Sequence, residues 1–241
     1  MAFDTQRRAL ITGASSGIGR ETAIAFAKAG IAVALVSRSQ DKLDALAAEL
    51  RALGVEAKGY AIDLAQVDQV QAAIAAVVDD FGPLDILVNN AGMAYTGLLG
   101  ATPITDAQTV LAMNVTSPLA CIQAVLPTMR DRKTGLIINV ASIAAQNAFP
   151  EWGIYSASKA ALVSLSRVLA AEEREHGIRV TIVSPGAVDT PLWDTETVQV
   201  DFPRSQMLTP AIVAQAILTT VQLPDSAVID EVTLMPSGGA L

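Results

Sequence analysis

A tyrosine and a lysine stand four residues apart in the segment Tyr155-Ser-Ala-Ser-Lys159. Positions i and i+4 of a helix share a face, so both side chains can reach one site. The pKa of an unperturbed tyrosine is about 10. A neighbouring ammonium group lowers that pKa, because it stabilises the phenolate. The pair is therefore suited to moving a proton to or from a substrate oxygen atom.

Two further polar residues, Ser142 and Asn114, could belong to the same site. Ser142 follows the apolar run 136–140, where its hydroxyl could hydrogen-bond a developing alkoxide. Each candidate also has an ordinary structural interpretation. Tyr155 could pack at a helix start, Lys159 could be solvated, Ser142 could lie in a turn, and Asn114 could cap a helix. Their occurrence together with the glycine-rich loop described next favours the catalytic interpretation.

The segment Thr12-Gly-Ala-Ser-Ser-Gly-Ile-Gly19 follows a strand-like run and opens a helical pattern. Its glycines permit a tight turn and let backbone N–H groups approach a pyrophosphate, while the helix N-terminus adds positive partial charge. An ordinary glycine turn is the alternative, but the strand–loop–helix context favours a dinucleotide. We expect the phosphates to contact Gly13, Ser15, Ser16, Gly17, Ile18 and Gly19.

The end of the second predicted strand indicates which dinucleotide is bound. NAD sites usually carry an acidic residue there, which bonds the ribose hydroxyls. Here the strand ends at Ser37 and Arg38 follows. An arginine can pair with the 2′-phosphate of NADP, whereas a carboxylate would repel it. Arg38 could instead be a solvated residue with Asp41 offsetting its charge, but we predict NADP(H).

Short apolar runs alternate with longer helical patterns along the whole chain. Strands are expected at 8–12, 32–37, 56–62, 86–89, 136–140, 179–184 and 231–235, and helices at 17–29, 41–53, 67–81, 105–129, 155–176 and 210–222. Pro118 and Pro127 fall inside the fourth helix, so a bend or break is expected there. The alternation predicts one α/β domain over 1–241: a doubly wound, mostly parallel sheet, or Rossmann fold, with helices on both faces. Ligands of such sheets lie beyond the carboxyl ends of the strands.

Composition narrows the possible partners and setting. Net charge is −8 and the pI about 4.6, which disfavours binding to nucleic acid or to anionic membranes. The single cysteine, Cys121, excludes an intrachain disulfide and is expected to be a small buried residue. With one histidine and one cysteine, we predict no metal site. No signal peptide or membrane span is recognised in the sequence, so a cytoplasmic setting is expected.

The order of these motifs resembles the short-chain dehydrogenases/reductases, in their compact single-domain branch. The resemblance rests on the glycine loop 12–19, Asn89-Asn-Ala-Gly92, Asn114, Ser142, Tyr155-Ser-Ala-Ser-Lys159 and Pro185-Gly186, and it covers essentially the whole chain. It implies that Tyr155 and Lys159 are the catalytic pair and also contact the cofactor, that Ser142 orients a carbonyl, and that Asn114 helps to hold a proton-relay water. Further implied cofactor contacts are Asp63 and Leu64 at the adenine, Asn90, Ala91 and Gly92 at the adenosine ribose, and Pro185, Gly186, Val188 and Thr190 at the nicotinamide.

The resemblance also implies a substrate lid at about 190–208. An apolar substrate pocket could form from Ala144, Trp152 and Trp193 together with Met93, Tyr95, Phe149, Leu192, Val198, Val200, Phe202 and Met207. The alternative is a loop that merely covers the core. Arg204 could meet an anionic substrate or could be solvated.

The expected activity is NADP(H)-dependent reduction of a ketone or aldehyde, or the reverse oxidation of an alcohol. A 3-oxoacyl-[acyl-carrier-protein] reductase is the main alternative. Those reductases usually close with a Val-Asn-Gly-Gly type segment, whereas this chain reads Leu234-Met-Pro-Ser-Gly-Gly239, and its acidity does not suit an acidic acyl carrier.

A non-catalytic cofactor-sensing protein is the remaining alternative, although such proteins typically lack the tyrosine or the lysine. The resemblance further implies a homo-oligomer, a tetramer or a dimer, that packs through the helices at 105–129 and 155–176.

Overall fold

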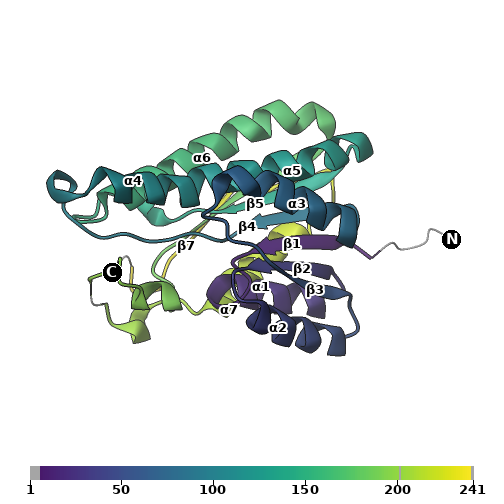
Figure 1. Ribbon diagram of the computed structural model, residues 1–241, viewed down its shortest axis with the longest axis horizontal. Helices are drawn as coiled ribbons and strands as arrows, with labels where there is room; N and C mark the ends of the chain where they lie inside the picture. The colour runs from purple at the N-terminus through teal and green to yellow at the C-terminus, as the bar shows by residue number, and fades with distance from the viewer. Residues whose placement is uncertain (1–5, 201, 240–241) are drawn as a thin grey trace.

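The computed structural model describes residues 6–200 and 202–239, and Figure 1 shows a central sheet with helices on both faces. Seven strands, all parallel to their neighbours, follow the order β3-β2-β1-β4-β5-β6-β7. The strands are β1 (Arg8–Thr12), β2 (Ala32–Ser37), β3 (Ala57–Ala61), β4 (Ile86–Asn89), β5 (Gly135–Val140), β6 (Ile178–Pro185) and β7 (Glu231–Leu234). The predicted doubly wound α/β fold is confirmed, and the strand order reverses between β1 and β4.

Seven helices cover the sheet. They are α1 (Gly17–Lys28), α2 (Gln40–Ala52), α3 (Val67–Phe81), α4 (Ile104–Leu111), α5 (Ser117–Arg132), α6 (Gly153–Glu173) and α7 (Pro210–Val221) among the described residues. In Figure 1, α3 to α6 lie above the sheet and α1, α2 and α7 lie below it. The observed ends of the strands and helices lie within three residues of the predicted ones, except for the predicted helix at 105–129.

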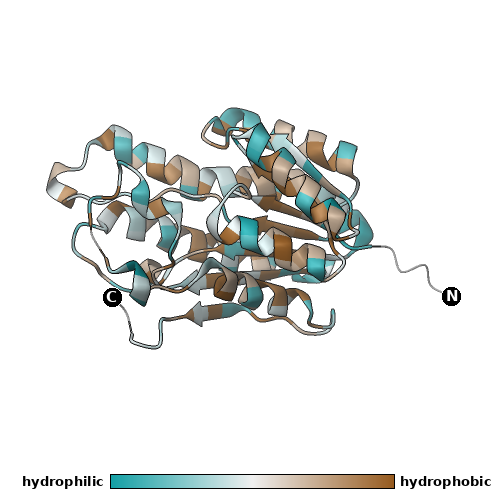
Figure 2. Cartoon of the chain, turned by 90° about the horizontal axis from the view of Figure 1, so that it is seen from below, coloured by the Kyte–Doolittle hydropathy of each residue, from teal (hydrophilic) through white to brown (hydrophobic). Residues whose placement is uncertain are grey.

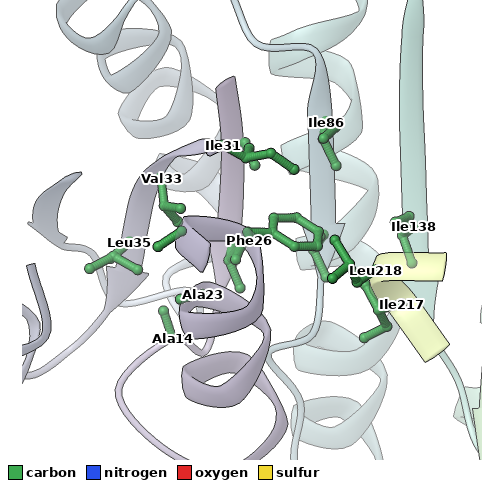
Figure 3. Close-up of a cluster of buried hydrophobic side chains, with 14 of the residues drawn as sticks. Ala14, Ala23, Phe26, Ile31, Val33, Leu35, Ile86, Ile138, Ile217 and Leu218 are labelled. Atoms are coloured by element: carbon green, nitrogen blue, oxygen red, sulfur yellow. The ribbon is translucent and has the colours of Figure 1, made fainter. Parts of the chain in front are cut away.

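Each face of the sheet has its own apolar core. On the lower face, Phe26 of α1 is fully buried and faces Ile217 and Leu218 of α7 (Figure 3). On the upper face, residues such as Leu87 and Met129 pack together between the sheet and α3, α5 and α6. Figure 2 shows apolar strands among helices that carry both polar and apolar residues. Burial of both faces explains why the strands read as continuous apolar runs rather than alternating ones.

The predicted helix 105–129 is two helices joined by a π-helical turn. The turn spans Ala112–Thr116, and the backbone N–H of Ser117 reaches the carbonyl of Ala112 across it. Pro118 follows in the first turn of α5 and has no N–H to donate to the preceding turn, so the missing bond falls directly after the π-turn. The interruption therefore lies just before the proline. It carries Asn114, a predicted site residue, and π-turns are frequent at functional sites.

The stretch Ile104–Arg132 is long and apolar enough to cross a membrane by length and composition, although the sequence showed no such span. More than half of its most apolar window is buried inside the chain, at 56%. Cys121 lies in this stretch with 1% of its surface exposed, and burial raises the pKa of its thiol to about 12. The apolar character is thus that of a core helix.

A line of buried polar side chains joins the sheet to α6. Asn89 Nδ2 on β4 donates to Asn139 Oδ1 on β5 at 2.9 Å. Asn139 Nδ2 in turn donates to Ser166 Oγ on α6 at 2.8 Å, and Ser166 Oγ donates to the carbonyl of Leu162. Buried polar groups are costly unless they are hydrogen-bonded, so this line fixes α6 against the two strands.

We predict that Asn139→Ala lowers the free energy of unfolding by about 2–4 kcal/mol, because it opens a small cavity and leaves Asn89 Nδ2 without an acceptor. Urea denaturation followed by circular dichroism measures this. Asn147→Ala is the matched control, since Asn147 is exposed and bonds only the nearby Ile143 carbonyl. Its expected cost is below about 1 kcal/mol. Equal losses in the two variants would contradict the structural role of the buried line.

Candidate active site

A cavity of about 1360 Å³ opens at the carboxyl ends of the strands. Pockets for one drug-sized ligand usually span roughly 300–1,000 Å³, so this cavity has room for a dinucleotide and a second small molecule. All the residues predicted for catalysis and cofactor binding except Gly19 and Asn114 line it, and so do three of the predicted pocket residues, Ala144, Trp152 and Trp193. These are Gly13, Ser15, Ser16, Gly17, Ile18, Ser37, Arg38, Asp63, Leu64, Asn90, Ala91, Gly92, Ser142, Ala144, Trp152, Tyr155, Lys159, Pro185, Gly186, Val188, Thr190 and Trp193.

The glycine loop connects β1 to α1 at one end of the cavity. Gly13 has φ +67°, a conformation that L side chains rarely adopt, and a Cβ there would lie 2.8 Å from Asn90 Nδ2. Gly19 lies behind the loop and packs against the Gly13 carbonyl, which explains why it does not line the cavity. Ser16 precedes α1 without a side-chain cap, so the first N–H groups of α1 have no side-chain partner there. Uncapped helix N-termini of this kind bind phosphates.

A threonine joins the two strands at which the sheet order reverses. Thr12 Oγ1, 1% exposed, accepts hydrogen bonds from the backbone N–H groups of Asn90 and Ala91, each at 3.0 Å. Asn90 Nδ2 returns a bond to the Thr12 carbonyl at 2.9 Å. The loop after β4 is thereby held against the glycine loop, which places Asn90, Ala91 and Gly92 in the cavity wall.

Basic residues stand at the end of β2. Arg38 is exposed, lines the cavity and forms no ion pair with any residue in the described ranges 6–200 and 202–239. Lys42, in the first turn of α2, lines the same part of the wall. Asp41 is absent from the wall. The sequence reasoning missed Lys42, although its spacing of four from Arg38 could have indicated a second cation.

Tyr155 lies in the cavity wall near the start of α6 and is 9% exposed. Burial raises the pKa of its hydroxyl, and the neighbouring Ser142 hydroxyl acts in the opposite direction. Ser142 follows β5, and its Oγ also accepts a bond from the backbone N–H of Ala144 at 3.1 Å. The two hydroxyls therefore meet at the surface of the cavity, with Tyr155 held in its protonated form at neutral pH.

Lys159 lies one turn further along α6 and is 5% exposed. Its Nζ donates to the carbonyl of Val140, the last residue of β5, at 2.9 Å and lies 5.9 Å from the centre of the Tyr155 ring. Burial lowers the pKa of Lys159 to about 8. An ammonium group has three N–H donors, so the bond to Val140 leaves two for a ligand in the cavity.

Asn114 lies behind the cavity wall and is 1% exposed. Its Nδ2 donates to the Met93 carbonyl at 2.8 Å and to Ser158 Oγ at 3.0 Å, and its Oδ1 accepts from the Met93 N–H at 2.9 Å. The side chain thus ties the loop after β4 to α6 beside Tyr155. Its role in holding a relay water stays a prediction.

The other end of the cavity is apolar and aromatic. Of the residues predicted there, Met93, Ala144, Phe149, Trp152, Leu192, Trp193, Val200 and Phe202 line the cavity.

Three residues predicted for this wall do not reach it. Tyr95 turns away to hydrogen-bond Asp106 at 3.1 Å. Val198 is buried in the apolar cluster with Ala94, and Met207 is buried beside the bridge that pairs Val188 with Leu208. The sequence could not show which of these apolar residues reach the cavity. Residues 190–208 form only short 3₁₀ turns, so the spacing of apolar residues there does not indicate which way a side chain points.

Arg204 holds together the segment after β6 and does not face the cavity. Its two terminal nitrogens bond Asp189 Oδ1 at 2.8 Å and Asp194 Oδ1 at 2.6 Å, and one of them also bonds the Thr190 carbonyl at 3.0 Å. Arg204 is not part of the cavity wall. The prediction that it could meet a substrate anion is therefore not supported by its position.

Several wall residues were not predicted from the sequence. They are Ser39, Ile62, Ala65, Thr109, Met113, Val140, Ala141, Ile143, Pro150, Ala187, Pro191, Asp194, Thr195, Glu196 and Thr197, together with Lys42. Most of them are next in sequence to a predicted residue, so the sequence had already indicated that part of the chain as part of the site. Thr109 and Met113 come from α4 and the π-turn and had no signal in the sequence.

The family model of short chain dehydrogenases matches residues 7–200 of the chain. The chain belongs to the short-chain dehydrogenase/reductase family. An uncharacterized oxidoreductase of Staphylococcus haemolyticus is 35% identical over 230 residues, which is 95% of this chain and 97% of the relative. The 3-oxoacyl-[acyl-carrier-protein] reductase of a Synechocystis strain is 34% identical over 98% of this chain and 97% of its own length.

Solved structures of the short-chain dehydrogenase/reductase family have the same fold. The alcohol dehydrogenase of Thermococcus sibiricus, solved with 5-hydroxy-NADP, superposes with a TM-score of 0.87 and 29% identity. The alignment covers 96% of this chain and 97% of that one. The resemblance recognised from the motifs is thus confirmed, and the chain is an oxidoreductase of this family.

We predict that Arg204→Ala loosens the lid of this short-chain dehydrogenase/reductase. Exposed ion pairs contribute at most about 1 kcal/mol each, so opening of 191–200 should increase about two- to tenfold. Limited proteolysis with chymotrypsin, which can cut after Trp193, measures the opening. Arg179→Ala is the matched control, because Arg179 pairs with Asp225 outside the lid. Equal cleavage of both variants would show that the Arg204 bonds do not hold the lid.

Proposed function

We propose that this chain is an NADP(H)-dependent carbonyl reductase that converts a ketone or aldehyde to an alcohol and runs in reverse as an alcohol dehydrogenase. One observation carries the proposal: Tyr155 and Lys159 line the same cavity as an uncapped, glycine-rich helix N-terminus. Tyr155 and Lys159 can move a proton, and the helix N-terminus can bind a pyrophosphate. We assign Asn114, Ser142, Tyr155 and Lys159 as the catalytic set.

The cavity residues fit a nicotinamide dinucleotide. Gly13, Ser15, Ser16, Gly17 and Ile18 would hold its pyrophosphate against α1. Further along, the adenine would lie by Asp63 and Leu64, its ribose by Asn90, Ala91 and Gly92, and the nicotinamide by Pro185, Gly186, Val188 and Thr190. When bound, the reduced nicotinamide supplies the hydride for carbonyl reduction.

The protein's own residues manage the proton and the oxygen atom. Burial keeps Tyr155 protonated, so it can donate its hydroxyl proton to the carbonyl oxygen as that oxygen gains electron density. The Ser142 hydroxyl, which lies beside that of Tyr155, orients the same oxygen. The Lys159 ammonium then stabilises the phenolate left on Tyr155. Asn114 fixes α6 and the Met93 loop so that these groups stay aligned.

Arg38 supports NADP(H) over NAD(H). Its guanidinium lines the cavity at the end of β2, where a carboxylate would be needed to bond the 2′-hydroxyl of NAD. Lys42 adds a second positive charge beside it. A guanidinium forms strong, paired hydrogen bonds with a phosphate group. The similar alcohol dehydrogenase of Thermococcus sibiricus was solved as a complex with 5-hydroxy-NADP, which agrees with this assignment.

Reduction of 3-oxoacyl groups on an acyl carrier protein is the second candidate. The Synechocystis reductase, similar over nearly the full length of both chains, favours it. The C-terminal sequence Leu234-Met-Pro-Ser-Gly-Gly239 and the net charge of −8 speak against it. We place the protein in the cytoplasm and expect a homo-oligomer, a tetramer or dimer, that packs through α5 and α6, where Val168 is 54% exposed.

We predict that Tyr155→Phe lowers kcat/KM for ketone reduction by about 100- to 10,000-fold, because the ring remains but the proton donor is lost. NADPH absorbance is followed against aryl ketones, aldehydes, small keto acids and an acetoacetyl thioester. NADPH binding should persist in the variant. A panel without any NADPH consumption by the wild type would refute the proposed function, and dominant turnover of the thioester would establish the second candidate.

The pH profile of the wild type tests the state of the catalytic pair. Reduction needs Tyr155 protonated and Lys159 charged. Because burial raises the pKa of Tyr155, the first condition holds through neutral pH. Because burial lowers the pKa of Lys159 to about 8, its charge is lost above that pH. We predict that kcat/KM for reduction is level below pH 8 and falls above it. A steady rise through pH 8 would contradict this assignment.

We predict that Arg38→Ser raises the Kd of NADPH about tenfold and leaves that of NADH nearly unchanged, because only NADPH carries the 2′-phosphate. Titration by calorimetry gives both constants. Lys28→Ser removes one positive charge from the exposed end of α1, away from the cavity, and controls for the net charge. Equal loss of both cofactors in Arg38→Ser would argue against the 2′-phosphate contact.

A further inference from the structure

Four aromatic rings form a continuous wall from the catalytic hydroxyl to the lid. The Tyr155 ring meets Trp152 at a centroid distance of 5.4 Å, Trp152 meets Trp193 at 5.6 Å, and Trp193 meets Phe202 at 5.4 Å. The interplanar angles of 66–79° make all three contacts edge-to-face, which is a favourable geometry for aromatic pairs. We call these four residues the aromatic wall.

The aromatic wall is fixed in place before any substrate binds. Trp193 Nε1 donates to the Val188 carbonyl at 2.8 Å, which ties the lid ring to the loop that follows β6. Trp152 is 8% exposed and packs with Ala144 and Tyr155 in one apolar cluster. A rigid, preformed surface of this kind loses little conformational entropy when a ligand binds.

Charges divide between the two ends of the cavity. Arg38 and Lys42 stand at the end of β2, beside the site proposed for the adenosine phosphate. At the end formed by the lid, the charged wall residues in the described part of the chain are Asp194 and Glu196. Arg204 is bonded to Asp189 and Asp194 and does not reach the cavity. Apart from Lys159 in the catalytic pair, the described residues of the substrate end therefore offer no cation to an anionic substrate.

We propose that the substrate is an uncharged aryl ketone or aryl aldehyde whose ring lies on the aromatic wall. This inference rests on the proposed carbonyl reductase function and narrows it. The carbonyl oxygen would meet Tyr155 and Ser142, and the ring would extend toward Trp193 and Phe202. Keto acids, and substrates with a carboxylate or phosphate near the carbonyl, are disfavoured because the lid is acidic and offers them no counter-charge.

The chain carries its own reporter for this pocket. It contains two tryptophans, and both of them, Trp152 and Trp193, belong to the aromatic wall. Tryptophan emission therefore responds to ligands at the substrate end. Unreactive amides can stand in for the carbonyl substrate, because their C=O group accepts the same hydrogen bonds without being reduced. Binding can then be measured apart from turnover.

The experiment titrates the NADP⁺ complex of the full chain with four amides and follows tryptophan emission. Acetamide lacks the ring, cyclohexanecarboxamide has a non-aromatic ring of similar size, benzamide has the aromatic ring, and 4-carbamoylbenzoate adds a carboxylate to it. We expect benzamide to bind at least about tenfold tighter than acetamide, a difference of about 1.4 kcal/mol. We also expect benzamide to bind more tightly than both cyclohexanecarboxamide and 4-carbamoylbenzoate.

A pair of variants separates the ring from its hydrogen bond. Trp193→Leu and Trp193→Phe both lose the Nε1 donor to Val188, but only the phenylalanine keeps an aromatic ring in the wall. Trp193→Phe should keep the preference for benzamide over cyclohexanecarboxamide, and Trp193→Leu should reduce it severalfold. Trp152 remains as the reporter in both variants.

Equal affinities across the series, tighter binding of 4-carbamoylbenzoate, equal preferences in the two variants, or no measurable binding of benzamide would each overturn the inference. The proposed function fails separately, if no carbonyl compound consumes NADPH. Reduction of keto acids or aliphatic ketones by an enzyme that does not prefer benzamide would keep the function and reject the aryl substrate.

Discussion

Burying an ammonium group such as that of Lys159 is costly, because the protein interior solvates a charge far less well than water does. The cost is visible in the lowered pKa of Lys159, and the Val140 carbonyl is the hydrogen-bond acceptor that accompanies it. Val140 ends β5, so this bond locks α6 to the carboxyl edge of the sheet. The orientation of Tyr155, one turn earlier on the same helix, follows from that attachment.

Other buried hydrogen bonds hold α6 in the same position. Ser166 is bonded to Asn139 of the sheet, and Ser158 is bonded to Asn114 of the π-turn. Asn114 also fixes the backbone of Met93, which belongs to the loop at the reversal of strand order. Tyr155 and Lys159 therefore sit on a rigid frame, while the segment around Arg204 is held by exposed ion pairs, which are weaker and screened by salt.

The sequence predicted the fold well because strands buried on both faces read as short apolar runs, and because Gly13 and Gly19 are needed where loop and strand approach closely. It also predicted that Tyr155 and Lys159 share one cavity, since the two residues are four apart on one helix. The sequence did not predict the positions of side chains that irregular backbone segments carry. The contacts of Arg204 and the π-turn at Asn114 leave no regular pattern of apolar residues in the sequence. For the same reason, the sequence could not distinguish residues that line the cavity from residues buried behind its wall.

The central claim is that hydride reaches a carbonyl carbon while Tyr155 supplies the proton to the oxygen. The most direct test reduces an aryl ketone with NADPH that carries deuterium at the transferable position of its nicotinamide and analyses the alcohol by mass spectrometry. We predict one deuterium on the carbinol carbon with the wild type and almost no alcohol with Tyr155→Phe. Alcohol without deuterium, or undiminished alcohol formation by the variant, would contradict it.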